Sequence, residues 1–271
     1  MCSVLFSGCE DINYEDYDDD NYLPNEYYSY LPEEYYSVSV ISPIYDGGED
    51  FIFTLTRTSS FEYRRNPDSD WGRYVALAQL NITNAQTGET LQQIEDIEIF
   101  HVQAFSLSVA DANFDGFNDV IVGVDSAGAQ GALIVNCWLW NYETRQFEYA
   151  LSFPQPNASI DTNAQVILTT NRGSAVARNW YIHKFMDGEF VLTNSMYRDM
   201  RRVGDSQYGE EPVWYWRYEQ RTLINGVWEE EVIYLPEHPD EYPSAYGGNP
   251  MFREGSIWNP RQEDLIFLWN N

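Results

Sequence analysis

The chain has 271 residues, a formal net charge of -28 and only 15 Lys and Arg residues. Surfaces that bind nucleic acid or an anionic membrane need clustered basic side chains, so this balance argues against both kinds of partner. With 44% hydrophobic and 16% aromatic residues, the chain can bury the core of one large domain or two small ones. Its acidic character would attract metal ions or a basic protein partner, although keeping the protein soluble is the more usual role of such a charge.

The first nine residues contain a short apolar stretch, residues 4–8, that ends at Cys9. This stretch resembles a bacterial lipobox, although Phe6 stands where leucine is usual. The basic region and most of the apolar region of a signal peptide are missing, so either the true start lies upstream or the resemblance is a coincidence. On the first reading, Cys9 carries a lipid and residues 1–9 are the remnant of a signal. We then expect a protein exported to the cell envelope, in the periplasm or on the outer surface, whose lipid is its contact with a membrane.

Residues 10–36 contain ten acidic residues and eight tyrosines without any Lys or Arg. A segment of this composition cannot bury an apolar face, so we expect a disordered tether. In a lipoprotein, repulsion between its like charges would extend the tether and hold the folded domain away from the membrane.

Short runs rich in β-branched and aromatic residues, bounded by turn residues, follow one another from residue 37 onward. The expected strands are at residues 38–41, 51–56, 74–80, 97–100, 105–109, 121–124, 133–140, 147–153, 165–170, 180–185 and 190–193. Because no long helical periodicity interrupts them, we expect residues 37–200 to form an all-β domain. The expected architecture is an antiparallel sheet, a sandwich or a partly open barrel.

Residues 201–271 combine a long hairpin with a proline-rich extension. Two amphipathic runs, residues 214–221 and 228–235, are joined across Asn225 and Gly226, a pair that favours a two-residue hairpin turn. The rest is rich in proline and ends in one more apolar segment, residues 265–269. This part is either a separate subdomain or an extension of the main sheet.

Trp214, Trp216 and Trp228 of this hairpin offer rings of the kind that stack on sugars in carbohydrate-binding modules. Trp214 and Trp216 are two residues apart and therefore share one face of a strand. Packing of such a face on the main domain is its more frequent use. A glycan-binding or cell-wall-binding module with surface Trp and Tyr is thus an alternative function.

Residues 111–119 place oxygen-bearing side chains at nearly alternate positions and a glycine, Gly116, where the chain must bend. Calcium loops use such a pattern, with side chains at positions 1, 3 and 5, a backbone carbonyl at position 7 and another acid at position 9. The candidate Ca²⁺ ligands are Asp111, Asn113, Asp115, the carbonyl of Phe117, and Asp119. An EF-hand would have glutamate at position 12, where this chain has Val122, so the loop is of another type. The alternative is a turn-rich loop that binds nothing.

The loop, with Gly123 four residues after Asp119, resembles the DxNxDGxxDxxxG element of FG-GAP and VCBS-type bacterial β proteins. An adhesion protein with an FG-GAP propeller would need several copies at a regular period. This chain contains the motif once. The propeller therefore remains the least favoured alternative.

Residues 90–195 as a whole resemble a family of bacterial exported proteins and lipoproteins that carry one such loop on a small β domain. The match continues from the loop through the glycine-containing residues 126–131, an aromatic strand that ends at Asn141, and the hairpin of residues 181–191. Members are similar to periplasmic inhibitors of lysozyme, some of which act as immunity proteins. The resemblance implies a protein partner such as a cell-wall hydrolase, whose cleft a surface turn would enter. The corresponding turn here is Arg172, Gly173, Ser174 and Ala175, without the tyrosine expected after it.

Catalytic chemistry has little support in the sequence. The three histidines, His101, His183 and His238, have no metal-ligand spacing, and no nucleophile or phosphate-binding motif is recognisable. Cys137 lies in an apolar run and is expected to be a buried thiol. We therefore expect a calcium-stabilised, exported or lipid-anchored binding protein that is not an enzyme.

Overall fold

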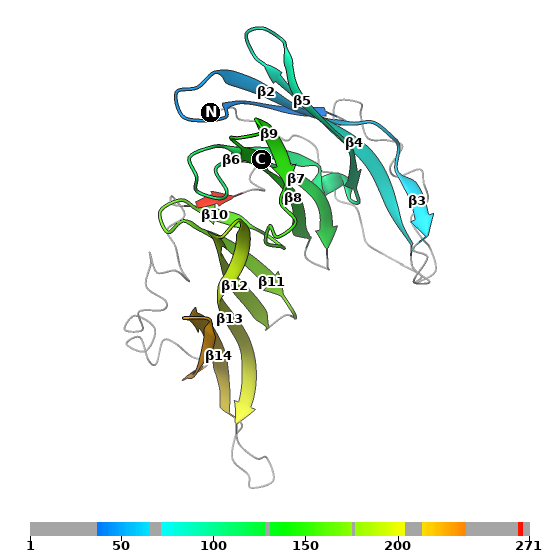
Figure 1. The fold of residues 1–271 in the computed structure, drawn as a ribbon. Coiled ribbons are helices and arrows are strands. Elements are labelled where there is room, and N and C mark those ends of the chain that lie inside the picture. The colour runs from blue at the N-terminus through cyan, green and yellow to red at the C-terminus, as the bar shows by residue number, and fades with distance from the viewer. Residues whose placement is uncertain are drawn as a thin grey trace, which may run out of the picture. The chain divides into compact units, whose positions relative to one another are not determined.

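The computed structural model describes residues 37–65, 72–127, 131–174, 177–203, 213–236 and 265–267. These residues form sixteen β-strands, one short 3-10 helix and no α-helix (Figure 1). Within them, no helix has the length and apolar character needed to cross a membrane. The all-β prediction is confirmed. The expected lipidation at Cys9 and the expected tether at residues 10–36 lie outside the described residues.

The first sheet is built around one long strand, β4, which pairs antiparallel with β2, β3 and β5. Strand β1 pairs with the other edge of β2. Alternate residues of β4, including Ala78, Leu80 and Ile82, are fully buried, as expected for a strand with one face on a core. The strands are β1 (Ser37–Pro43), β2 (Asp50–Arg57), β3 (Glu62–Arg65), β4 (Gly72–Asn84) and β5 (Thr90–Ile99).

The second sheet has four strands in the order β6-β7-β8-β9 and follows the short helix η2 (Val102–Ala104). Its strands are β6 (Ser106–Ala110), β7 (Asp119–Ala127), β8 (Ala132–Asn141) and β9 (Gln146–Tyr149). Both faces of β7 are apolar, because Val120 and Val122 join one core cluster whereas Ile121 joins another. A strand that is buried on both faces has a continuous run of hydrophobic residues, which explains why residues 120–122 of β7 are all apolar.

The third sheet has seven strands in the order β15-β14-β13-β12-β11-β10-β16. Its strands are β10 (Ser159–Asp161), β11 (Val166–Arg172), β12 (Arg178–Met186), β13 (Glu189–Val203), β14 (Val213–Ile224), β15 (Val227–Pro236) and β16 (Leu265–Phe267). The expected boundary at residue 200 falls inside β13, which pairs with β14 along most of its length. The C-terminal hairpin is therefore an extension of this sheet.

The three sheets are stacked as layers within residues 37–271. One core cluster joins the first sheet to the second, and another joins the second sheet to β10, β11 and β13. Figure 1 shows the second sheet, in green, between the blue and cyan first sheet and the yellow third sheet. Within the described residues none of the three sheets closes on itself, so of the expected arrangements the structure is consistent with the sandwich.

Some strands differ from those expected. Strands β3 and β10 were not expected, and β13 spans 15 residues where an apolar pattern marks only residues 190–193. The additional part of β13 is mostly polar or charged, but β12 and β14 pair with it on both sides and satisfy its backbone groups. The hairpin turn at Asn225 and Gly226 is confirmed, with the positive φ at both residues that a type I′ turn requires.

Candidate functional site

The candidate calcium loop connects β6 to β7 and is attached to the segment that follows β1. The backbone N–H of Asn118 donates to the carbonyl of Ile44 at 2.6 Å, and its side-chain amide donates to the carbonyl of Pro43 at 2.9 Å. The ring of Phe117 makes an edge contact with Tyr45, with 6.1 Å between the ring centroids. The loop is thus held between the first and second sheets.

The side chains of Asp111, Asn113 and Asp115 converge within the loop. The carboxylate of Asp111 accepts hydrogen bonds from the backbone N–H of Asp115 at 3.1 Å and of Gly116 at 2.9 Å. The side-chain amide of Asn113 donates to the Asp115 carboxylate at 2.9 Å. Phe114 and Gly116 have positive φ, which gives the tight bend that brings these residues together. The sequence spacing predicted this convergence.

Asp119 has a different environment from the other acids, because its side chain is completely buried. One carboxylate oxygen accepts the backbone N–H of Ala112 and the other accepts that of Trp140, both at 2.8 Å. Burial raises the pKa of Asp119 to about 7, although these two hydrogen bonds act in the opposite direction, and the charges of Asp115 and Asp111 raise it further. Asp119 therefore ties the loop to strand β8.

Carboxylate, amide and carbonyl oxygens, as in this loop, are the kind of ligand that a hard cation such as Ca²⁺ prefers. Its ligands would be the side chains of Asp111, Asn113 and Asp115 and the backbone carbonyl of Phe117. Asp119 would supply the buried carboxyl at position 9 of the loop. Burial raises the pKa of Asp111, and the charge of Asp115 contributes to the rise. A bound cation would relieve this repulsion and favour the charged carboxylates. Among the residues that the structure describes, no group of three or more His, Cys, Asp and Glu side chains is placed to hold a metal, so amide and carbonyl oxygens would have to complete the set.

Gly123 occupies a position on β7 where no side chain fits. A Cβ atom there would lie 2.0 Å from the carbonyl oxygen of Ala104 and 2.3 Å from the hydroxyl of Ser106. Such distances are far below van der Waals contact. The glycine of the sequence pattern therefore allows the backbone next to η2 to pass close to β7.

A hollow of about 790 Å³ opens beside the loop, and Asn113 and Asp115 form part of its wall. Three exposed apolar or aromatic side chains border it, namely Tyr142 (68% exposed), Tyr149 (53%) and Leu151 (87%). Its carboxylates are those of Asp115, Glu143, Glu148 and Glu189. Sequence patterns did not reveal this surface, because its residues come from the β8–β9 hairpin, the segment after β9 and the β12–β13 turn. Leu151 gave no signal in the sequence, since it falls in the strand expected at residues 147–153, whereas β9 ends at Tyr149.

The turn formed by Arg172, Gly173 and Ser174 joins β11 to β12, and its described residues are exposed. The backbone N–H groups of Gly173 and Ser174 donate to the carbonyl of Ala177, and the Ser174 hydroxyl accepts the N–H of Ala177 at 3.0 Å. Ala175 lies outside the described residues. The turn is therefore closed by its own hydrogen bonds and accessible to a partner.

The tryptophans proposed for glycan stacking do not form one platform. Leu223 is directly opposite Trp228 in the β14–β15 pair, and it is seven residues from Trp216, so Trp216 and Trp228 lie on opposite faces of the sheet. The guanidinium of Arg198 lies 4.5 Å from the centre of the Trp216 ring. Trp228 is 44% exposed. The side chain of Trp214 is not among those the structure describes.

The cysteine and the two histidines that the structure describes have surroundings that explain them without a functional role. Burial raises the pKa of the Cys137 thiol well above its ordinary value. Burial also lowers the pKa of His183 to about 4. His101 caps η2, with Nδ1 accepting the backbone N–H of Gln103 at 3.3 Å. Cys137 is thus a neutral thiol and His183 a neutral imidazole at pH 7.

The chain was compared with protein families, curated proteins and solved structures. No protein-family model matches the chain. No curated protein matches it either. Among solved structures, the chain matches one described as that of a Xanthomonas type IV secretion system related protein, with a TM-score of 0.43 and 12% sequence identity. The match covers 72% of this chain and 98% of the other.

Proposed function

We propose that this chain is a calcium-stabilised, non-catalytic binding protein that recognises a basic protein partner at the hollow beside its loop. The observation that carries the proposal is the position of the candidate ligands Asn113 and Asp115 in the wall of an acidic, aromatic hollow. Aromatic side chains and exposed carboxylates together suit a positively charged protein surface. Calcium in the loop would fix one side of that surface.

The resemblance to lysozyme inhibitors supplies a specific candidate partner. Lysozyme-type hydrolases that cleave the cell wall have an acidic cleft, but a basic outer surface would be attracted by the carboxylates of the hollow. The exposed turn at Arg172 would be the second contact. Export to the cell envelope, with a lipid on Cys9, belongs to the same proposal and would place the protein where such hydrolases act.

Calcium should stabilise the folded chain. Because the cation binds the ordered loop and not the unfolded chain, a concentration about 100 times the dissociation constant should raise Tm by roughly 5–10 °C. The measurement is thermal unfolding with calcium, with magnesium and with chelator. Magnesium should give a much smaller shift, since it demands a more regular octahedral site.

The variant Asp115→Ala should reduce that calcium-dependent shift to less than half. Glu62→Ala, which removes an exposed carboxylate from β3, is the matched control and should keep the full shift. An equal shift in Asp115→Ala and in the unchanged protein would remove the loop from consideration as the calcium site.

The hollow should bind a cationic lysozyme. We expect Glu143→Gln combined with Glu189→Gln to weaken retention of the protein on an immobilised lysozyme by about tenfold at physiological salt, because two exposed carboxylates of the hollow become neutral. The combination of Glu62→Gln with Glu89→Gln makes the same change in net charge elsewhere and should have little effect. Retention on peptidoglycan instead of lysozyme would favour the glycan-binding alternative. If the Glu143→Gln, Glu189→Gln variant is retained on lysozyme as strongly as the unchanged protein, the proposal is contradicted.

A further inference from the structure

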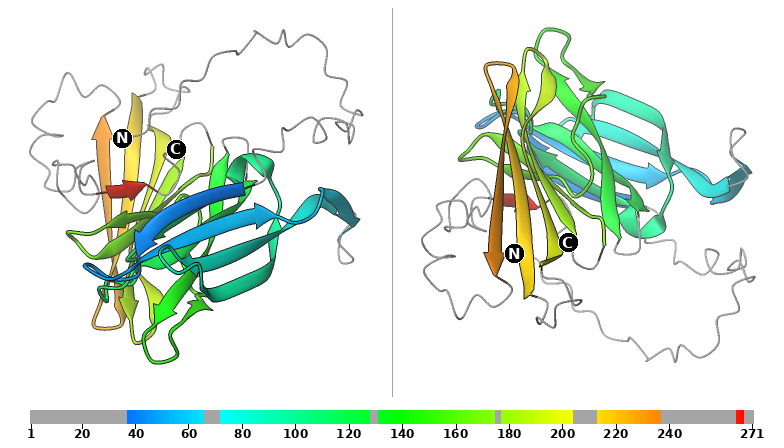
Figure 2. Two further views of the ribbon diagram at one scale, coloured as in Figure 1. Left: turned by 90° about the horizontal axis from the view of Figure 1, so that it is seen from above. Right: turned by 90° about the horizontal axis from the view of Figure 1, so that it is seen from below.

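Strand β15 is the outer strand of the seven-stranded sheet. It pairs with β14 on one side and with no other strand among the described residues. Figure 2 shows the orange β14–β15 hairpin at that edge of the sheet. In an edge strand, every second residue turns its backbone N–H and C=O away from its one neighbour, so these groups can pair with an added strand.

The edge is long, regular and exposed. Residues 227–232 are all exposed, and the pairing with β14 runs without a bulge from Val227 to Pro236. Three of its apolar side chains are among the most exposed in the described chain, namely Val227 (65%), Trp228 (44%) and Val232 (38%). Sheet edges that must stay unpaired are commonly shortened, bulged, charged or interrupted by proline, and of these features only charge, at residues 229–231, occurs in residues 227–232.

Three consecutive glutamates occupy the middle of this edge, at positions 229, 230 and 231. Glu230 shares one face of the sheet with Trp228 and Val232, whereas Glu229 and Glu231 share the other face with Val227. The cross-strand neighbours of Glu229 and Glu231 are Thr222 and Gln220, which are uncharged. No ion pair to Glu229 or Glu231 is present within the described part of the chain.

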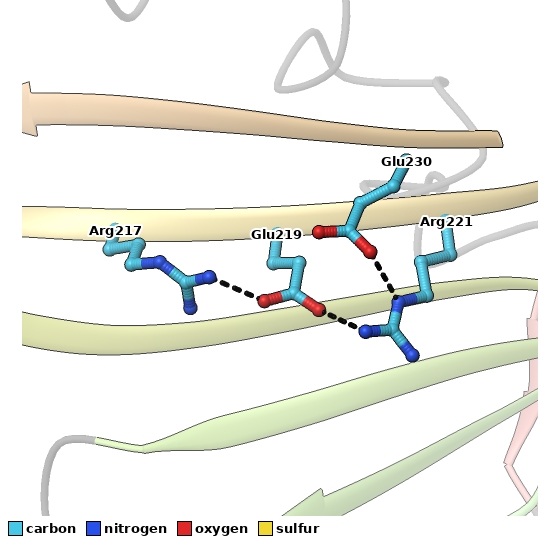
Figure 3. Close-up of polar contacts among 4 residues, drawn as sticks. All are labelled: Arg217, Glu219, Arg221 and Glu230. Carbon is cyan, nitrogen blue, oxygen red and sulfur yellow. Dashed lines mark hydrogen bonds and ion pairs between the residues drawn. The ribbon is translucent and has the colours of Figure 1, made fainter.

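The face of Glu230 already holds basic side chains. Arg221 lies between two acids, with its Nε 3.1 Å from Glu230 and one terminal nitrogen 2.7 Å from Glu219 (Figure 3). Arg217 pairs with the other oxygen of Glu219 at 2.5 Å. These pairs lower the pKa of Glu219, with the hydrogen bond from Arg217 as the largest cause. Glu230 is thus partly neutralised from inside the sheet, so Glu229 and Glu231 give the edge most of its uncompensated charge.

The charge pattern decides what can pair with β15. A second copy of this strand, added antiparallel and centred on Glu230, would place Glu229 opposite Glu231, and like charges directly opposite each other are destabilising. A basic strand would place its cations against these carboxylates. The exposed Trp228 and Val232 would contact apolar residues two positions from its centre.

We propose that the edge of β15 binds an extended basic segment of a partner protein by strand addition. The segment that fits has three consecutive basic residues with an apolar residue on each side. Backbone hydrogen bonds to the edge give the binding energy common to such additions, and the alternating side chains give the specificity. This surface is separate from the hollow and does not depend on it.

The test uses the full chain and a fluorescent, capped peptide, Thr-Val-Arg-Lys-Arg-Val-Thr, with anisotropy as the readout. We expect salt-dependent binding that is weakened at least tenfold by Glu229→Gln combined with Glu231→Gln. The combination of Glu62→Gln with Glu89→Gln, two exposed carboxylates outside both proposed surfaces, has the same change in net charge and should leave the affinity within about twofold. Equal loss in both double variants would mean general attraction to an acidic protein and would overturn the proposal.

Two peptides with every second backbone nitrogen methylated, one in each alternation, keep the charge and remove edge-facing N–H donors. Strand addition requires that at least one of them binds at least tenfold more weakly than the unmodified peptide. Hydrogen exchange of the β15 amides should also slow when the unmodified peptide is bound. Unchanged affinity for both methylated peptides would show that no strand is added. Because the hollow residues take no part in β15, failure here would leave the function proposed for the hollow untouched.

Discussion

Replacing Asp119 by alanine should lower the free energy of unfolding by about 3 kcal/mol even when calcium is removed by a chelator. The change leaves the buried N–H groups of Ala112 and Trp140 without their acceptor, and each unsatisfied buried donor costs about 1–3 kcal/mol. Relief from burying a carboxyl whose pKa is raised to about 7 offsets part of this loss at pH 7. Urea unfolding monitored by tryptophan fluorescence measures the difference.

The comparison of Asp119→Asn with Asp119→Ala separates the structural role of this residue from a role as a metal ligand. Asparagine retains one acceptor, so it should satisfy one of the two N–H groups and lose about half as much stability as alanine. Asp115→Ala, which removes an exposed loop acid, should cost less than about 1 kcal/mol in chelator. If Asp119→Ala unfolds no more readily than Asp115→Ala without calcium, then Asp119 has no role in holding the loop to β8.

Gly123→Ala should be among the most destabilising single-methyl changes in the chain, at about 3 kcal/mol or more. The new Cβ would lie 2.0 Å from the carbonyl oxygen of Ala104, which is a backbone atom and cannot rotate away. The short helix η2 would have to move from the second sheet, and its contact with β7 would be lost. The measurement is again equilibrium unfolding in urea.

Gly173→Ala is the matched control for that substitution. The nearest atom to a Cβ at this position is the Ala177 side chain at 3.7 Å, an ordinary contact distance. We expect a change within about 0.5 kcal/mol. Similar stability of the two alanine variants would mean that the close approach of Ala104 to β7 does not exist in solution.

Local sequence patterns were sufficient for most strands and for the loop. Strands such as β2, β7 and β8 have apolar residues with β-propensity bounded by turn residues, and these features act over a few neighbouring residues. Gly188 and Gly226 each have a positive φ, which glycine adopts readily. The residue type by itself therefore indicates these two turns. The convergence of Asp111, Asn113 and Asp115 followed in the same way, since the residues are two apart in one tight bend.

The extent of β13 shows where such patterns fail. Its polar second half has no alternating apolar face, and it is a strand because β12 and β14 supply hydrogen-bond partners on both sides. Whether residues beyond 200 formed a subdomain could not be decided from their composition for the same reason. Pairing between strands depends on residues distant in the chain, which local propensity does not encode.

By itself, the sequence determined the acidic character, the all-β class, the hairpin turns and the oxygen-rich loop, because composition and short-range spacing govern each of these. The tertiary structure decided the burial of Asp119 with its hydrogen bond from the backbone of Trp140, the close approach at Gly123 and the hollow beside the loop. Each of these features joins segments far apart in the chain, as the separation of 21 positions from Asp119 to Trp140 illustrates. Which segments meet depends on how the three sheets pack, and that packing is a property of the whole core.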